Sequence, residues 1–236
     1  MFKRRKNIWG VSVRGPAHYA NGLPNQDSFL IKKTRKGLVA VVADGLGSKP
    51  HSDKGAREAC RAVLKAIRTF ENLSVQIYDL LLLIQGYWTV ALKNFPASKC
   101  SSTCLFVYIS DTGIFAARLG DGMIFLLGKD DTSSEMLTDI KEDSFSNATF
   151  CLTSKNIFSH WEVKKFSKEL FSSILLCTDG ISSDLKDGRQ KDFVKEFSEN
   201  VFKKNISQNK KDTEEMLVNW PVKGHSDDKT LVFIEL

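Results

Sequence analysis

The chain has 236 residues, of which 42% are hydrophobic and 26% are charged, and its formal net charge is +6. This balance is that of an ordinary soluble globular protein with enough apolar residues for a full core. Lys and Arg are interleaved with Asp and Glu outside residues 3–6, and there is no zinc spacing or basic-aromatic stripe, so we expect no nucleic-acid partner.

The first half of the chain predicts short strands followed by two helices. Residues 14–26 are rich in Gly, Pro and Asn and predict a loop. Ser52 is a suitable N-cap for the first helix, where Gly55 and Ala56 are expected to allow close packing. The second helix is predicted over about residues 75–95, from apolar side chains at helical spacing. The strands are predicted at residues 8–13, 29–32 and 38–43.

Three β-rich runs follow, at residues 103–110, 113–119 and 123–127. Their connections are so short that they allow only antiparallel neighbours, so we predict a β-meander. Residues 129–147 are polar and predict a long surface excursion. The remaining elements are a strand at 174–178, helices at 193–202 and 213–220, and a strand at 231–236. An antiparallel sheet system with a helical pair inserted early belongs to the α+β class.

The domain boundaries and the compartment also follow from the pattern. We treat residues 1–8 as a basic N-terminal tail and residues 9–236 as a single domain. Five cysteines without a Cys-x-x-Cys pair favour free thiols in a reducing compartment. The N-terminus lacks the apolar run of a secretory signal. The longest apolar stretch, residues 80–84, is far below the roughly 20 residues of a membrane helix. We therefore expect a cytoplasmic monomer with no membrane partner.

Four apolar strands begin or end at an aspartate. Asp44 and Asp179 each follow a strand and precede a glycine, whereas Asp27 and Asp227 come just before strands. One Asp-Gly pair is ordinary turn chemistry, but adjacent antiparallel strands can bring four such ends to one edge. Two carboxylates about 4 Å apart repel by roughly 4 kcal/mol at an effective dielectric near 20. A cluster of them therefore requires cations, and hard oxygen ligands suit Mg²⁺ or Mn²⁺.

These residues resemble the ordered motifs of the type 2C metal-dependent serine/threonine protein phosphatases, in particular their compact bacterial members. The motifs, in chain order, are Asn25-Gln26-Asp27-Ser28, Asp44-Gly45-Leu46-Gly47, Ser52-x-x-Gly55-Ala56, Gly120-Asp121-Gly122, Thr178-Asp179-Gly180 and Ser226-Asp227-Asp228-Lys229-Thr230. The resemblance extends from about residue 9 to the C-terminus. It implies a central antiparallel β-sandwich flanked by α-helices on both sides, in four layers ordered α/β/β/α.

The resemblance also implies a site with two divalent cations, Mn²⁺ or Mg²⁺, at one end of the sandwich. Asp44 matches the carboxylate that bridges both ions, and Gly45 matches the glycine whose carbonyl is a ligand. Asp179 and Asp227 match the ligands of the first ion. Asp27 matches an acidic residue that binds directly or through water.

Two further positions have implied roles. Asp121 matches the ligand of a third, weaker metal site, and Asp228 stands where the family often has Asn, so we expect it behind the ligands. The implied activity is hydrolysis of phosphoserine and phosphothreonine in proteins by direct attack of a metal-bridging water. The substrate is then a phosphoprotein, and the counterpart enzyme is a Ser/Thr kinase. The implied catalytic set is Asp27, Asp44, Asp179 and Asp227.

Three departures from the family pattern leave alternatives open. Gln26 stands where many relatives have Glu, and Leu46 stands where some have His. The usual phosphate-binding Arg is absent, and Arg14 or His18 from the same loop can replace it. One alternative function is a catalytically weak or inactive module that binds phosphoproteins in signalling. Another is a metal-dependent hydrolase of a small phosphorylated metabolite.

Overall fold

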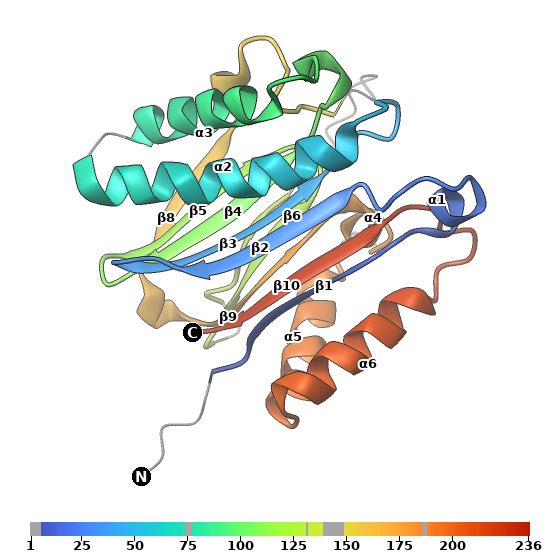
Figure 1. Cartoon of the computed structure of the whole chain (residues 1–236). Coiled ribbons are helices and arrows are strands. Elements are labelled where there is room, and N and C mark those ends of the chain that lie inside the picture. Colours follow the sequence, from blue (N-terminus) through green and yellow to red (C-terminus); the bar gives the residue numbers. More distant parts are fainter. Residues whose placement is uncertain (1–5, 74–76, 131, 139–148, 186–187) are drawn as a thin grey trace.

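Two antiparallel sheets stacked face to face form the centre of the protein (Figure 1). The computed structural model describes residues 6–73, 77–130, 132–138, 149–185 and 188–236. One sheet has the strand order β1-β10-β9-β6-β7, and the other has the order β2-β3-β4-β5-β8. Every pairing between these strands is antiparallel. The expected α+β class with a central antiparallel sandwich is confirmed.

Strands from every part of the chain contribute to the two sheets. The first sheet contains β1 (Ile8–Val13), β10 (Lys229–Glu235), β9 (Phe171–Cys177), β6 (Met123–Gly128) and β7 (Glu135–Leu137). The second sheet contains β2 (Asp27–Lys33), β3 (Gly37–Asp44), β4 (Cys104–Ser110), β5 (Gly113–Leu119) and β8 (Glu162–Phe166).

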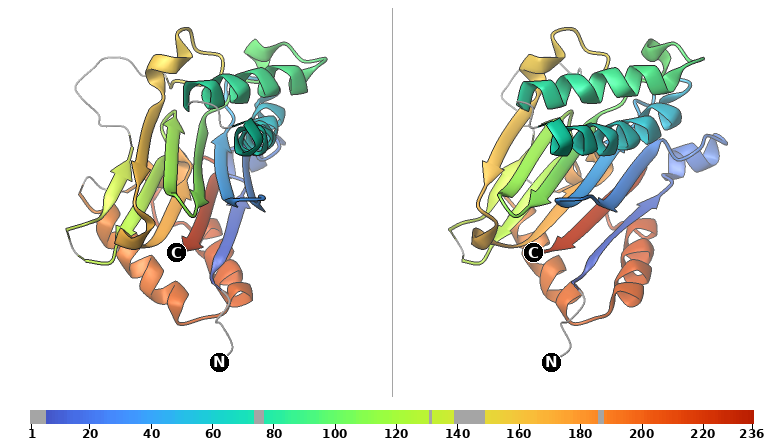
Figure 2. Two further views of the ribbon diagram at one scale, coloured as in Figure 1. Left: turned by 90° about the vertical axis from the view of Figure 1, so that its left-hand side faces the viewer. Right: turned by 60° about the vertical axis from the view of Figure 1, so that its left-hand side comes forward.

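Helices cover the outer face of each sheet, as the two views of Figure 2 show. The pair α2 (Ser52–Leu73) and α3 (Ile77–Leu92) covers the sheet that contains β3. The pair α5 (Gln190–Phe202) and α6 (Ile206–Val218) covers the other sheet. The expected four-layer order α/β/β/α is confirmed. The described residues also form two short helices and three 3₁₀ turns, namely α1 (Pro16–Ala20), α4 (Asp179–Ser182), Ala97–Lys99, Ile157–His160 and Lys168–Leu170.

Strand β3 shows why the sequence contains continuous apolar runs. Val39, Val41 and Ala43 pack against α2 and α3, whereas Ala40 and Val42 pack between the two sheets. Since successive side chains of a strand point to opposite faces, a strand that is covered on both sides needs apolar residues at every position. A third apolar cluster joins the outer face of the other sheet to α5 and α6.

The predicted β-meander is wrong. β4 and β5 do pair, but β6 lies in the other sheet, between β9 and β7. The chain changes sheet at residues 120–122, where Gly120 has a φ of +105°. A Cβ at Gly120 would also lie 2.5 Å from the Thr103 side chain. The left-handed conformation of Gly120 directs the chain away from β5, and β8 becomes the second neighbour of β5 instead.

Several other boundaries differ from the predicted ones. The loop at residues 14–26 contains α1, and the polar excursion contains β7, whose Leu137 is fully buried. Helix α6 begins at Ile206, where the side chain of Asn205 accepts a hydrogen bond from the Gln208 backbone nitrogen at 3.0 Å. Ser52 is the first helical residue of α2 and not its N-cap. Strand β8 had no counterpart among the predicted elements.

Parts of three expectations lie outside the described residues. They are residues 1–5 of the basic tail, residues 75–76 of the second predicted helix, and residues 131 and 139–147 of the polar excursion. All five cysteines are buried and free, as expected. Within the described part of the chain, no helix has both the length and the apolar character needed to cross a bilayer.

The first turns of α2 pack tightly against the segment that leads into β4. A Cβ at Gly55 would clash with the carbonyl oxygen of Cys100. The Gly55 carbonyl accepts a hydrogen bond from Trp88 Nε1 at 3.0 Å, which ties α2 to α3. Ala56 is completely buried. The structural role expected for Gly55 and Ala56 is confirmed.

Gly55→Ala is therefore expected to lower the free energy of unfolding by about 1–3 kcal/mol, because the added methyl group overpacks a backbone contact. Gly86→Ala is the matched control, since Gly86 lies within α3 and a Cβ there meets nothing within 4 Å. This control is expected to raise the free energy of unfolding by about 0.5–1 kcal/mol. Urea denaturation measures both, and equal effects of the two changes would contradict the packing argument.

Candidate metal centre

Both sheets deliver aspartates to the end of the sandwich at which α1 and α4 lie (Figure 1). Asp27 and Asp44 stand opposite each other in the β2–β3 ladder. Asp121 lies in the crossing between β5 and β6, and Asp179 begins α4 directly after β9. Asp227 comes two residues before β10. The site thus joins the ends of strands from the two sheets, and not the edge of a single sheet.

Three of these carboxylates form a compact cluster. Asp44, Asp121 and Asp179 each offer one oxygen, and the three oxygens all lie within 4.8 Å of one another. The Asp44 backbone is held on both sides by Thr103, whose Oγ1 accepts from the Asp44 nitrogen at 2.9 Å and whose nitrogen donates to the Asp44 oxygen at 2.8 Å. The position of Asp44 is therefore set by the β3–β4 edge.

Burial and mutual repulsion oppose ionisation of these groups. Burial raises the pKa of Asp44 well above its usual value, and the charges of Asp27, Asp179, Asp227 and Asp121 raise it further. Burial likewise raises the pKa of Asp179 to about 7, with repulsion from Asp121 and Asp227 as the next causes. Desolvation and like charges both favour the neutral form of these carboxyl groups, so a positive charge bound among their oxygens would favour ionisation.

A divalent cation fits this arrangement. The donors of the cluster are carboxylate oxygens, which are the ligands that Mg²⁺ and Mn²⁺ prefer. A cation among the oxygens of Asp44, Asp121 and Asp179 would convert the repulsion into attraction. Gly45, expected to contribute its carbonyl, lies beside Asp44, and a Cβ at this position would be 2.5 Å from the Ser52 carbonyl oxygen.

Asp27 and Asp227 lie next to the three-carboxylate cluster but outside it. Thr178 Oγ1 donates a hydrogen bond to Asp27 Oδ2 at 2.8 Å. Burial raises the pKa of Asp27 to about 7, against the lowering effect of hydrogen bonds from Thr230 and Thr178. Asp227 is exposed, and its Oδ1 accepts a hydrogen bond from the Asp228 backbone nitrogen at 2.8 Å. Its charge nevertheless acts on both Asp44 and Asp179.

Asp228 holds the segment between β1 and β2 against the site. Its side chain is 2% exposed. Its Oδ1 accepts from the Gly15 nitrogen at 2.6 Å, and its Oδ2 accepts from the Gln26 nitrogen at 2.6 Å. His18 Nδ1 lies 2.8 Å from the same Oδ2. One buried carboxylate therefore organises a whole loop, which explains why an acidic residue suits this position behind the candidate ligands.

The two candidates for phosphate binding have different surroundings. His18 is engaged with Asp228 through Nδ1. Arg14 donates from a terminal guanidinium nitrogen (Nη1) to the Leu23 carbonyl at 3.2 Å, and its guanidinium carbon lies 4.5 Å from the centre of the Tyr19 ring. The structure thus places Arg14 on the exposed side of the α1 segment and uses His18 to hold that segment in place.

Besides Thr103, three threonines near the aspartates were not among the predicted site residues. Thr178 and Thr230 are hydrogen-bonded to each other, since the Thr230 nitrogen donates to Thr178 Oγ1 at 3.1 Å. Both belong to the family-like motifs, Thr178 directly before Asp179 and Thr230 two residues after Asp228, so their positions in the sequence could have indicated them. Thr149 Oγ1 donates to Asp121 Oδ2 at 2.6 Å. No sequence pattern indicated Thr149, because it meets Asp121 only through the tertiary fold.

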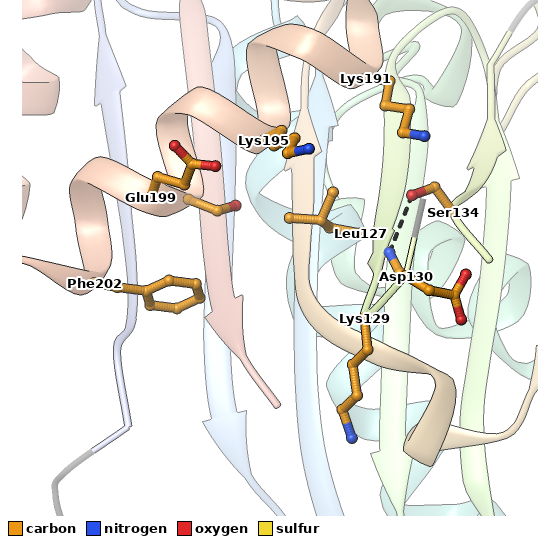
Figure 3. Close-up of a pocket in the computed structure, with 10 residues that line it drawn as sticks. Leu127, Lys129, Asp130, Ser134, Lys191, Lys195, Glu199 and Phe202 are labelled. Carbon is orange, nitrogen blue, oxygen red and sulfur yellow. Dashed lines mark hydrogen bonds between the residues drawn. The ribbon is translucent and has the colours of Figure 1, made fainter. Parts of the chain in front are cut away.

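A hollow of about 320 Å³ between β6 and α5 contains none of the predicted site residues (Figure 3). Lys129, Lys191, Lys195 and Glu199 lie around it, and Ser134 Oγ accepts a hydrogen bond from the Gly128 nitrogen at its wall. Acidic and basic groups are both present, and we assign this hollow no part in the chemistry of the acidic cluster.

Known structures share this fold. A bacterial serine phosphatase superposes with a TM-score of 0.68 at 16% identity, covering 98% of each chain. The serine/threonine phosphatase Stp1 from Staphylococcus aureus gives 0.67 at 14% identity, covering 100% of this chain and 96% of that one. RsbX in complex with magnesium gives 0.57 at 17% identity, covering 100% and 98%. Among curated protein sequences, none matches this chain significantly.

The family model described as protein phosphatase 2C matches residues 14–220. This range includes Asp27, Asp44, Asp121 and Asp179, and only Asp227 of the five aspartates lies beyond it. The matched range covers most of the chain and includes every strand of the two sheets except β1 and β10. The chain therefore belongs to the protein phosphatase 2C family.

Proposed function

We propose that this protein is a Mn²⁺- or Mg²⁺-dependent phosphatase that hydrolyses phosphoserine and phosphothreonine monoesters in proteins. The observation that carries the proposal is the convergence of the Asp44, Asp121 and Asp179 carboxylates within 4.8 Å. Membership of the protein phosphatase 2C family supports it. When bound, two divalent cations supply an activated water nucleophile and offset the charge of the phosphoryl oxygens.

The five aspartates would share the binding of the cations. Asp44 would bridge the two cations, with the Gly45 carbonyl as a further ligand. Asp179 and Asp227 would hold the first cation, and Asp121 a third, weaker one. Asp27 would bind a cation directly or through water, and the hydrogen bond from Thr178 fixes its orientation.

The segment between β1 and β2, which Asp228 holds in place, would bind the substrate. Arg14 is the better candidate for the substrate phosphate, because its guanidinium lies on the exposed side of this segment. His18 would act by fixing the segment, since its Nδ1 is engaged with Asp228. We propose a phosphoprotein, modified by a Ser/Thr kinase, as the substrate, and we propose that the protein acts as a monomer in the cytoplasm.

A phosphoprotein-binding module without turnover is the second candidate. Its support is the set of departures from the family pattern, namely Gln26, Leu46 and the missing phosphate-binding Arg. A hydrolase of small phosphorylated metabolites is the third candidate. Its substrates distinguish it from a protein phosphatase, so rates measured on phosphopeptides, nucleotides and sugar phosphates show which class of compound is turned over.

Purified protein is expected to hydrolyse p-nitrophenyl phosphate only with Mn²⁺ or Mg²⁺ present. Asp44→Asn is expected to reduce turnover by more than about 100-fold, because the loss of even a supporting hydrogen bond to a metal ligand costs 10–100-fold. Asp111→Asn is the control, since Asp111 is exposed in the turn between β4 and β5. Full activity of Asp44→Asn would sink the proposed site, and a lack of metal-dependent turnover in the wild type would favour the binding module.

The metal-free protein is expected to lose stability as the pH rises from about 4 to about 7. Asp27 and Asp179, whose pKa values are raised to about 7, bind protons more tightly in the folded state than at the unfolded value near 4. Their contribution is therefore complete at low pH and disappears as the pH rises through about 7. Melting curves in EDTA measure this loss, and Asp179→Asn should reduce it.

Excess Mn²⁺ is expected to restore the melting temperature at pH 8 more than at pH 5, because the cation binds the ionised carboxylates. At about 100 times the dissociation constant, it adds about 2.7 kcal/mol to the free energy of unfolding. A Mn²⁺ effect that is the same at both pH values, or is unchanged in Asp44→Asn, would show that the ion acts elsewhere.

A further inference from the structure

A recess of about 250 Å³ opens directly beside the acidic cluster. Asp179 and Asp227, two of the candidate metal ligands, form part of its wall. The remaining wall comes from Ser183 and Asp184 after α4 and from residues 222–226 before β10. A phosphoserine whose phosphate reaches the acidic cluster would therefore bring a neighbouring residue of the substrate to this recess.

A buried lysine forms the inner end of the recess. Lys229 is 1% exposed and begins β10 on the face that continues with Leu231 and Phe233, both of which pack in the apolar cluster with α5 and α6. The alternation of the strand would place an apolar side chain at this position. A lysine here introduces a positive charge at a place where burial is costly unless the charge is compensated.

The hydrogen-bond partners of Lys229 are neutral. Its Nζ donates to the Asp227 backbone oxygen at 3.0 Å and to His225 Nδ1 at 3.0 Å. None of the ion pairs formed by the described residues involves Lys229. Among the residues that the structure describes, no carboxylate lies within ion-pair distance of this ammonium, and the charges of Asp184, Asp227 and Asp228 act on it from farther away.

Lys229 also determines the hydrogen-bonding character of His225. An ammonium group has donors only, so His225 Nδ1 must accept the hydrogen bond. The neutral imidazole then carries its proton on Nε2 and has a donor there. His225 lines the recess together with Lys223, whose side chain is exposed. The two lysines and the histidine therefore provide donors from adjacent positions.

The acidic groups of the recess are already engaged. Asp184 Oδ2 accepts a hydrogen bond from Trp220 Nε1 at 2.8 Å. In the proposed function, Asp179 and Asp227 bind cations, which offset their charge. Lys223 and Lys229 then outweigh Asp184, and the recess is positively charged.

We infer that this recess binds an anionic side chain, carrying a carboxylate or a second phosphate, that lies next to the scissile phosphoserine of the substrate. The inference rests on the proposed function and adds a substrate preference to it. Lys223, at the rim, is the residue that selects the anionic group, and Lys229 is a positioning residue that holds the 225–227 segment and contributes charge at the inner end.

The test compares phosphoserine peptides that differ only in the flanking residues, which are Glu, Ala or Lys. With Mn²⁺, the wild type is expected to show a kcat/KM about 10-fold higher for the Glu peptide than for the Ala peptide, as one charge-assisted contact provides. The Lys peptide should be the poorest. Lys223→Glu is expected to abolish or reverse this order, while Lys210→Glu, the same charge change on an exposed position of α6, should keep it.

Lys229→Met provides a second variant that keeps an apolar chain of similar length. It is expected to lower the Glu-to-Ala ratio and to raise the Mn²⁺ concentration needed for half-maximal rate, because the Asp227 carbonyl loses its donor. Lys229→Arg should recover part of both effects. A melting curve identifies a variant that fails to fold, in which case the Lys223 comparison alone decides.

The possible results distinguish a failure of the recess inference from a failure of the proposed function. If p-nitrophenyl phosphate is hydrolysed with Mn²⁺ but Glu and Ala peptides are turned over equally, the recess inference is overturned and the proposed function stands. The same holds if Lys223→Glu and Lys210→Glu keep equal preferences. If no turnover occurs at all, binding of the same peptides with a non-hydrolysable phosphonate is measured by fluorescence anisotropy. Tighter binding of the Glu peptide then supports the recess, and equal binding overturns it.

Discussion

Repulsion among buried carboxylates is the constraint on which the rest of this structure depends. Asp44 stands at the centre of that repulsion, since Asp27, Asp121, Asp179 and Asp227 all act on it. Burial and like charges both oppose ionisation, so the arrangement is stable at neutral pH only with protons or cations to compensate it. A sheet sandwich that places several strand ends at this point therefore makes a site that favours hard divalent cations.

The surrounding structure holds this unfavourable arrangement in place. Thr103 fixes the Asp44 backbone from the neighbouring strand, and Thr178 orients Asp27. Asp228 ties the α1 segment to the start of β10 through three contacts. These groups hold the acidic residues and the α1 segment in place, so a bound cation would require little rearrangement of the protein. The tight packing of α2 at Gly55 supports the same end of the fold.

Two basic residues near the acidic cluster hold backbone segments in place. His18, one of the two residues that could replace the missing phosphate-binding Arg, instead contributes to holding a loop. Lys229 is a comparable case on the opposite side of the cluster, where a charged residue occupies an apolar position of β10 and holds the segment before it. Both residues hold backbone segments near the candidate metal ligands.

The sequence by itself determined the fold class and the family, and it indicated Asp44, Asp121 and Asp179, which the structure brings together. Apolar runs ending in Asp are local patterns, and their order along the chain is distinctive. The boundaries of β1 and β5 were also local and agree with the prediction. Only the tertiary structure decided that β6 leaves β5 for the other sheet, since a hairpin and a crossing between sheets have the same three-residue signature. The contacts of Thr149 with Asp121 and of Asp228 with residues 15–26 join distant parts of the chain. Such contacts depend on how the two sheets pack against each other, which local sequence patterns do not predict.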